Sequence, residues 1–300
     1  MDNAPRIELD AKAMASLELD ETSRLVELQN AQATFKLDDF QYITDKLEIM
    51  LAASPSPGSS NLLLTGYVGS GKSTILTEFA QAHALREMEP GILSLPVLYM
   101  VMPSEPTKLS VLSALLETLN YPVSGRLSTA EYERLVFRVL RTMSVRMLIF
   151  DEIQHINFSA YGKKIAGLLD LIKYFGIYLD IPVVCGGTHS ISTAVLDEDP
   201  ALKRRFGQPE EPSLYLETEE LRELLTLIQP TIGLKRAEPL TTDSMVEAIK
   251  ENSNGTIDSI YLVIRRAAQY VIQMKTEYID ETTFEAMGWK TPPLSDGSRG

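Results

Sequence analysis

The sequence predicts an α/β fold in which a parallel sheet is flanked by helices on both faces, followed by a small C-terminal helical lid. Three observations support this prediction. A glycine-rich loop separates a short apolar run from an amphipathic stretch within residues 61–85. Near-continuous apolar runs then alternate with stretches of helical periodicity as far as residue 217. From residue 218 onward, the predicted elements all have helical periodicity.

The glycine-rich loop, TGYVGSGKST at 65–74, has the pattern of a phosphate-binding loop, which indicates a P-loop NTPase core. Its glycines allow a tight turn, so that backbone N–H groups and the next helix N-terminus attract phosphate. Lys72 is expected to reach the β- and γ-phosphates of ATP, and the Ser73 hydroxyl to hold Mg²⁺. The residues expected to contact the nucleotide are Gly66, Val68, Gly69, Ser70, Gly71, Lys72, Ser73 and Thr74.

The predicted elements follow the order that a parallel sheet requires. Strands are expected at residues 61–64, 96–102, 146–153, 181–188 and 213–217. Helices of the sheet region are expected at 74–85, 111–119, 128–143 and 165–179. Ser128 or Thr129 suits the N-cap of the third of these helices. The lid helices are expected at 219–228, 241–253, 256–275 and 280–288.

The same changes in sequence pattern divide the chain into four predicted segments. Residues 1–30 are expected to form an appended, partly helical arm, and residues 31–217 the ATPase core. Residues 218–290 are expected to form the lid. Residues 291–300 are rich in proline, glycine and serine, which predicts a flexible tail.

The amino-acid composition limits the classes of protein to which the chain can belong. The chain has 300 residues, of which 44% are hydrophobic and 23% charged, as in ordinary globular proteins. A single cysteine, Cys185, leaves no intrachain disulfide, so a reducing cytoplasm is the expected location. The N-terminus has no apolar signal region, and no apolar run approaches the roughly 18 residues of a membrane span, so no membrane contact is expected.

The net charge of −13 argues against a broad nucleic-acid-binding surface, which would normally be basic. Any DNA contact is therefore expected from a local basic patch, or from one patch repeated around an oligomer.

A second motif places two acids directly after the apolar run at 147–150. A strand that ends in two carboxylates presents them at the ligand-binding edge of a parallel sheet. Asp151 suits the Mg²⁺ shell, directly or through water, and Glu152 suits a general base that polarises the attacking water. A kinase needs no such base because its nucleophile is the substrate, so the pair favours an ATPase that hydrolyses ATP.

The next strand and the segment after it supply further candidates. Thr188 ends that strand and is expected to sense or orient groups around the γ-phosphate, whereas His189 is interpreted as structural. Arg204 and Arg205 suit an arginine finger that reaches the nucleotide of a neighbouring subunit. The alternative for these two arginines is a solvated basic turn.

The order of these features resembles that of an AAA+ ATPase. The run MLIFDEIQHI and the stretch that follows it, within residues 146–206, resemble the TnsC/TniB family of AAA+ transposition regulators, with its DEIHH-like strand. The resemblance extends over about residues 35–290. It implies a DNA-stimulated, Mg²⁺-dependent ATPase that forms a ring or helical filament on duplex DNA. It further implies partners of two kinds: a DDE transposase of TnsB/TniA type and, beside a CRISPR effector in some systems, a TniQ-type targeting adaptor. ATP hydrolysis would control disassembly.

In this family, DNA contacts come from the segment after the second strand. The residues that occupy it here are Lys108, Ser124 and Arg126. Short polar and basic groups of this kind hold phosphates without reading sequence. A stripe of arginines at 134, 138 and 141 is interpreted as a solvated helix face, and is the next candidate for DNA contact.

The sequence departs from the AAA+ pattern at the lid. Many lids place an arginine at the start of the sensor helix, whereas Thr256 and Asp258 stand there, with Arg265 and Arg266 two turns later. The adenine contact is not fixed by the sequence, and the candidates are Phe40, Tyr42 and Ile43.

Other functions are less consistent with the sequence. An AAA+ loader or replication-initiator ATPase is the main alternative, but such initiators usually carry a winged-helix domain after the lid, and the chain ends shortly after its last predicted helix. A signalling ATPase would carry a long repeat region downstream. A nucleotide-binding scaffold without activity would not need the base Glu152.

Overall fold

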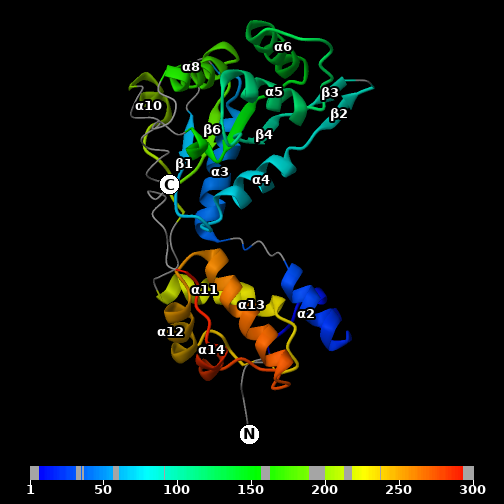
Figure 1. Ribbon diagram of the computed structural model, residues 1–300, viewed down its shortest axis with the longest axis vertical. Coiled ribbons are helices and arrows are strands. Elements are labelled where there is room, and N and C mark those ends of the chain that lie inside the picture. The colour runs from blue at the N-terminus through cyan, green and yellow to red at the C-terminus, as the bar shows by residue number, and fades with distance from the viewer. Residues whose placement is uncertain are drawn as a thin grey trace. The chain divides into compact units, whose positions relative to one another are not determined.

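The computed structural model describes residues 7–31, 35, 37–56, 61–90, 92–156, 163–188, 200–212, 218–236 and 238–292. These residues fall into two compact units, each of which is drawn in Figure 1. The sheet unit comprises Asp38–Tyr67 and Lys72–Pro212. The helical unit comprises the described residues of Met1–Leu37, Val68–Gly71 and Ser213–Leu294.

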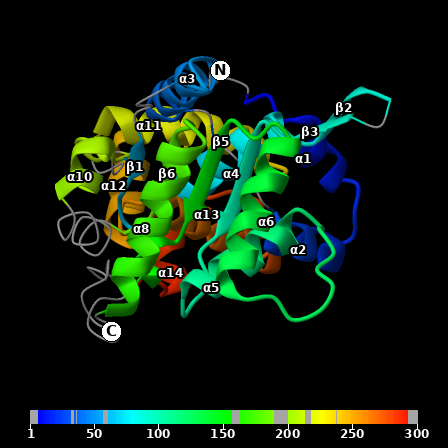
Figure 2. The same ribbon diagram turned by 90° about the horizontal axis from the view of Figure 1, so that it is seen from above.

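The sheet unit contains a four-stranded parallel sheet of order β1-β6-β5-β4, whose strands lie side by side in Figure 2. The first four predicted strands are confirmed, as β1 Leu62–Leu64, β4 Val97–Val101, β5 Met147–Asp151 and β6 Val183–Gly186. Every residue of β1, β5 and β6 is buried. A parallel sheet covered on both faces requires such continuous apolar strands, so the predicted α/β fold is confirmed.

The sheet continues beyond β1 at one further position. Glu210 pairs with Leu64 in parallel, and its N–H donates to the Leu63 carbonyl at 2.8 Å. The Thr65 N–H in turn donates to the Glu210 carbonyl at 2.8 Å. The strand predicted at 213–217 lies outside the described residues.

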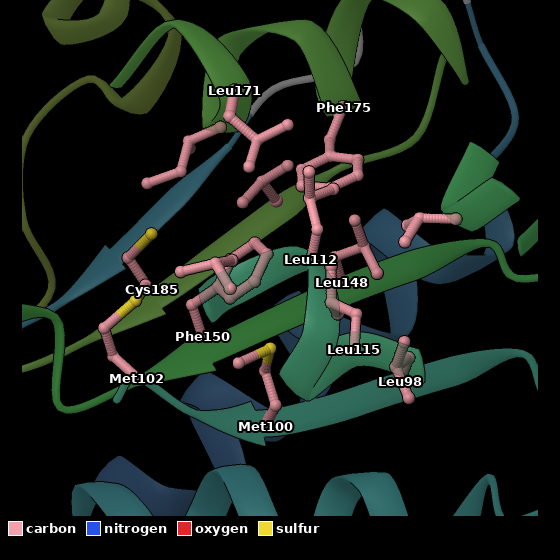
Figure 3. Close-up of a cluster of buried hydrophobic side chains, with 14 of the residues drawn as sticks. Leu98, Met100, Met102, Leu112, Leu115, Leu148, Phe150, Leu171, Phe175 and Cys185 are labelled. Atoms are coloured by element: carbon pink, nitrogen blue, oxygen red, sulfur yellow. The ribbon is translucent and has the colours of Figure 1, made fainter. Parts of the chain in front are cut away.

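The four helices predicted for the sheet region are confirmed, and the described residues of this unit form two more. The helices of this unit are α3 Asp38–Ala52, α4 Lys72–Ala82, α5 Lys108–Thr118, α6 Thr129–Thr142, α8 Lys163–Tyr178 and α10 Pro200–Phe206. Ser128 caps α6 in a capping box with Glu131, which confirms one of the two predicted caps. Against one face of the sheet, Leu112 and Leu115 of α5 and Phe175 of α8 pack with Phe150 of β5 (Figure 3).

A short antiparallel hairpin, β2 Arg86–Glu89 and β3 Ile92–Ser94, was not predicted from the sequence. All four residues of β2 are exposed, so the hairpin has no buried face there to impose an apolar alternation.

The helical unit contains the four predicted lid helices together with the two helices of the arm. Its helices are α1 Ala11–Ser16, α2 Glu21–Asn30, α11 Thr218–Ile228, α12 Asp243–Asn252, α13 Ile257–Gln273 and α14 Glu281–Met287. Within the described residues, no helix is long and apolar enough to cross a membrane.

The arm is tied to the rest of the helical unit by a buried ion pair. Arg24 of α2 is 3% exposed, and its two terminal nitrogens donate to the carboxylate of Glu277 at 2.6 and 2.7 Å. The same guanidinium donates to the Gly233 carbonyl at 2.9 Å. The hydrogen bonds from Arg24 hold the pKa of Glu277 below its usual range. The arm therefore packs as part of the helical unit.

Candidate active site

The phosphate-binding loop has the backbone that its glycines permit. Gly66, Gly69 and Gly71 have φ values of 146°, 82° and 88°, in the region that residues with a side chain avoid. Lys72, the first residue of α4, is 8% exposed, and its ammonium donates to the carbonyls of Gly66 at 3.0 Å and Tyr67 at 2.6 Å. These two carbonyls are hydrogen-bond partners for the buried Lys72 ammonium, which lies within the loop expected to surround phosphate.

The other predicted loop residues differ in exposure. Ser73 is exposed at the start of α4, whereas Thr74 is half-buried. Val68 is 69% exposed, and Ser70 is buried. An exposed serine hydroxyl at this position is available to a cation that also contacts phosphate.

The part of the loop that belongs to the helical unit contacts the lid helix α13. The Asp258 N–H donates to the Gly69 carbonyl at 3.3 Å. A Cβ added to Gly69 would lie 3.1 Å from the Cβ of Asp258 and 3.1 Å from the Thr256 hydroxyl. The helix start that lacks a sensor arginine therefore packs closely against the loop, and this approach requires glycine at position 69.

The two arginines farther along α13 are engaged within the helical unit. Arg265 donates to the Ala31 carbonyl, and its guanidinium lies 5.3 Å from the ring centre of Tyr261. The guanidinium of Arg266 lies 4.2 Å from the ring of Trp289. These contacts give both side chains structural partners.

Asp151 ends β5 and is only 1% exposed. Its Oδ2 accepts a hydrogen bond from the Tyr99 hydroxyl at 3.0 Å, and its Oδ1 accepts one from the Glu152 N–H at 2.9 Å. Burial, with a further contribution from the Asp151 charge, raises the pKa of Tyr99 to about 12, so the phenol stays protonated and donates. A Cβ on Gly186 of β6 would lie 2.6 Å from Oδ1, so only glycine leaves room for this carboxylate.

The oxygen donors at this edge fit Mg²⁺. The ion prefers carboxylate and hydroxyl oxygens and keeps several waters, so one buried carboxylate and one serine hydroxyl are a sufficient protein contribution. Asp151 and Ser73 offer these two groups.

Glu152 follows directly and has a left-handed backbone, with φ 57° and ψ 39°. This conformation is uncommon outside glycine and asparagine, and it turns the chain from β5 into the short 3₁₀ helix η1, Ile153–His155. The Gln154 side-chain amide donates to the Glu152 carboxylate. The same amide accepts the Thr188 N–H through Oε1 at 3.2 Å. Gln154 therefore bridges the carboxylate predicted to be the base and the residue predicted to sense phosphate.

Sequence reasoning did not single out Gln154. The available signal was its place in DEIQHI, where the DEIHH-like pattern has histidine. The following His155 hydrogen-bonds through Nδ1 to the Met102 carbonyl at 2.8 Å, which orients the end of η1.

Thr188 lies just after β6 with its hydroxyl buried. Among the described residues, this hydroxyl has no hydrogen-bond partner. A buried hydroxyl without a partner is costly, and it is an available ligand for a phosphate oxygen or a water. His189 lies outside the described residues.

The arginine pair lies on α10 rather than in a turn, and its two members differ. Arg204 is exposed. Arg205 is half-buried: its Nη1 lies 3.7 Å from the position that a Cβ on Gly176 would occupy, and its carbonyl accepts the Asn61 N–H at 3.0 Å. The exposed Arg204 is therefore the better candidate for contact with another chain.

The predicted DNA-contact residues lie at the N-terminus of α5 and in the loop that leads to α6. Lys108 forms an ion pair with Glu133 at 2.7 Å, which offsets part of its charge. Ser124 and Arg126 are exposed on either side of Gly125, whose φ is 79°.

The three candidates for the adenine contact lie on α3 and differ in their exposure to solvent. Phe40 and Ile43 are 7% and 2% exposed and belong to the core, whereas Tyr42 is 56% exposed.

Together, the parallel sheet, the phosphate-binding loop and the acids at the end of β5 define the class of AAA+ P-loop ATPases. Among solved structures, the chain is similar to the Aeropyrum pernix ORC2 protein in its ADPNP–ADP complexes, with 15% identity, a TM-score of 0.63, and coverage of 88% of this chain and 71% of that one. The sequence profile of the family described as "Bacterial TniB protein" matches residues 25–214, so the chain belongs to the TniB family.

Two further solved structures have the same fold. One is the Aeropyrum pernix ORC1 protein in complex with DNA, with 18% identity, a TM-score of 0.63, and coverage of 88% of this chain and 68% of that one. The other is a point mutant of Thermotoga maritima RuvB, with 19% identity, a TM-score of 0.51, and coverage of 82% of this chain and 67% of that one. None of the curated proteins searched matches the sequence.

Proposed function

We propose that this protein is an ATP-dependent regulator of transposition that assembles on duplex DNA and is released when ATP is hydrolysed. The observation that carries this proposal is the arrangement at the end of β5, where buried Asp151 and Gln154-bound Glu152 follow one another in a chain of the TniB family. This arrangement supplies a metal ligand and a base at the edge of the sheet where ligands bind.

Each residue of this site has a role that follows from its chemistry. Lys72 would pair with the β- and γ-phosphates of ATP, and Asp151 and Ser73 would hold Mg²⁺. Bound Mg²⁺ would act as a Lewis acid toward the phosphate oxygens. Glu152 accepts a proton from the attacking water, while Gln154 orients its carboxylate. The Thr188 hydroxyl, which has no partner among the described residues, would donate to a γ-phosphate oxygen or to that water.

We assign completion of the site to a second chain in a homo-oligomer, a ring or a helical filament. The exposed Arg204 supplies positive charge to the γ-phosphate bound by its neighbour, whereas Arg205 packs within its own sheet unit. An arginine in this role is worth roughly 10³-fold or more in rate.

Duplex DNA is the proposed surface for assembly, with Lys108, Ser124 and Arg126 against the phosphates. The complex of the similarly folded ORC1 protein with DNA supports DNA as a ligand. Membership of the TniB family supports a DDE transposase and a TniQ-type adaptor as partners, and a cytoplasmic location.

A second candidate function is an AAA+ loader or replication initiator. The observation that favours it is the likeness to the ORC proteins over most of this chain. The two functions differ in partner: a transposition regulator should stimulate a transposase on target DNA, and a loader should recruit a helicase.

The assembly is tested by ATP turnover in mixtures of two variants on duplex DNA. Lys72→Ala chains lack the phosphate contact but keep Arg204, and Arg204→Ala chains have the reverse defect. Mixing them should restore part of the turnover, and turnover per wild-type chain should rise with protein concentration and with added DNA. Turnover that is independent of concentration, with no rescue on mixing, would place the arginine within its own site or outside catalysis.

A further inference from the structure

A hollow on the sheet unit lies between α6 and α8, and none of the residues that line it is assigned to ATP or to DNA. Its volume is about 610 Å³. One wall carries arginines of α6 and the other carries tyrosines of α8. The residues that define this arginine–tyrosine groove are Arg134, Arg138, Arg141, Tyr174 and Tyr178, with Phe137 at its base.

The tyrosine wall is an aromatic surface whose rings pack on one another. The rings of Tyr174 and Tyr178 are stacked, with centroids 5.1 Å apart and planes at 19°. Both rings meet Phe137 edge-on, at 5.1 and 5.2 Å. The tyrosines are nevertheless 41% and 46% exposed, so a large apolar area that packing holds in place remains open to solvent.

The arginine wall is only partly a solvated helix face. Arg134, Arg138 and Arg141 are spaced so that they share one side of α6. The guanidinium of Arg141 lies 4.5 Å from the centre of the Tyr178 ring and donates to the Tyr178 carbonyl at 3.1 Å. This contact joins the two walls and fixes one of the three cations.

The charge of the groove is opposite to that of the chain. The protein carries a net charge of −13, whereas the groove has three arginines and one lining carboxylate, Glu133, which is paired with Lys108. Guanidinium groups bind carboxylates through two parallel hydrogen bonds, and tyrosine faces receive apolar or aromatic side chains.

We propose that the arginine–tyrosine groove docks an acidic peptide segment of a partner protein, whose carboxylates pair with the arginines while an aromatic or proline side chain lies on the tyrosines. This surface is separate from the nucleotide site, so the proposal goes beyond the proposed ATPase function and does not depend on it.

The exposed tyrosine faces favour a peptide over duplex DNA. The bases of a duplex are stacked on one another inside the helix, so a duplex offers such a surface mainly its phosphates. A duplex could therefore touch the arginines along the rim but would leave the tyrosine faces uncovered. An extended peptide can enter the hollow and contact both walls.

The test selects binders from a display library of short random peptides on the full-length protein, then measures affinity for the enriched peptides by fluorescence anisotropy. Enriched peptides should combine Asp or Glu with an aromatic residue or proline. Arg134→Glu/Arg138→Glu should weaken their binding by roughly tenfold or more for each charge reversed. Tyr174→Ala should weaken it at high salt as well as low salt, because its contribution is not ionic.

The matched control is Lys12→Glu/Arg86→Glu, which makes the same charge change at two exposed sites outside the groove. It should leave peptide affinity unchanged, and thermal melting should show that all the variants fold.

Three results would overturn the proposal. The first is selection without acidic enrichment, or acidic peptides that bind the groove variants as well as the parent. The second is loss of duplex DNA binding in Arg134→Glu/Arg138→Glu with peptide binding intact, which would assign the arginines to DNA. The third is loss of self-association alone, measured by sedimentation, which would make the groove a contact between copies.

Discussion

Both units of this protein bury a charged side chain, but they do so in different ways. In the helical unit, Arg24 meets the carboxylate of Glu277 at 2.6 Å. In the sheet unit, Asp151 is also buried, yet among the described residues its carboxylate accepts hydrogen bonds only from the Tyr99 hydroxyl and the Glu152 N–H. A buried pair of opposite charges joins two segments, whereas a buried carboxylate that has no counter-ion among the described residues is a candidate ligand for a cation.

The two buried charges are therefore expected to have different roles: the ion pair stabilises the fold, and the single carboxylate serves the activity. Removing one member of the buried pair should cost stability and leave the chemistry of ATP unaffected. Removing the isolated carboxylate should do the opposite, because the folded state already bears the cost of burying it.

The largest expected effect on activity comes from Asp151→Asn. The amide keeps the shape of the side chain, and the Tyr99 hydroxyl can rotate to accept from it. Loss of the proposed Mg²⁺ ligand should weaken the stabilisation of the transition state by the metal, so ATP turnover should fall by roughly 100-fold or more. The midpoint of urea unfolding should stay the same or rise. Asp170→Asn, at an exposed acid on α8, is the control. A fall in stability with turnover preserved would reverse the assignment.

The largest expected effect on stability comes from Arg24→Ala. It leaves the Glu277 carboxylate without its main partner, and breaking a buried pair costs about 3–5 kcal/mol. Because the folded pKa of Glu277 is lowered, the pair stabilises the parent above the usual glutamate pKa, and this stability is lost as pH falls through the folded value. Urea unfolding from neutral to acid pH should therefore show convergence of parent and variant. Lys12→Ala, exposed on α1, should be neutral, and a constant difference at every pH would exclude this linkage.

A smaller effect is expected from Gln154→Ala, which frees the Glu152 carboxylate and the Thr188 N–H from their common partner. Turnover should fall by roughly 10- to 100-fold, with the Kd for ATP nearly unchanged, because the base is misplaced and not removed. Gln154→His, which restores the DEIHH-like pattern, should recover part of the rate, and Gln81→Ala on α4 should have no effect. An equal loss in ATP affinity would mean that Gln154 acts on binding.

The smallest expected effect is that of Lys108→Glu/Arg126→Glu on duplex DNA. Each reversal removes about one phosphate contact and should lower the salt dependence of binding, with little difference between DNA sequences. Because Lys108 is already paired with Glu133, Arg126→Glu should account for most of the loss. Unchanged affinity across a salt titration would move the DNA surface elsewhere. The control Lys12→Glu/Arg86→Glu corrects for net charge.

The sequence predicted the fold where the chain is regular. The local patterns are the apolar runs at β1, β4, β5 and β6 and the phosphate-binding loop at the first turn. They could be recognised from the sequence alone, without knowledge of tertiary contacts. The β2–β3 hairpin was missed because its exposed residues carry no apolar period.

The residue types of the candidate site could be predicted from the sequence, but the contacts between those residues could not. Asp151 and Glu152 follow a strand, and their chemistry is evident from that position. The Gln154 bridge and the packing of Asp258 against Gly69 join segments far apart in sequence, or depend on a left-handed turn, so no local pattern signalled them. The same holds for Arg24 and Glu277, which are 253 residues apart.

The central claim is that Glu152 converts ATP binding into turnover and thereby limits the lifetime of the protein on DNA. The most direct measurement follows Glu152→Gln on duplex DNA, recording ATP bound, ATP hydrolysed and the dissociation rate after dilution. The amide cannot accept the proton, while Lys72, Ser73 and Asp151 remain, so ATP should stay bound, hydrolysis should be lost, and the assembly should persist on DNA. Hydrolysis at the parent rate, or release from DNA at the parent rate with ATP still bound, would contradict the account.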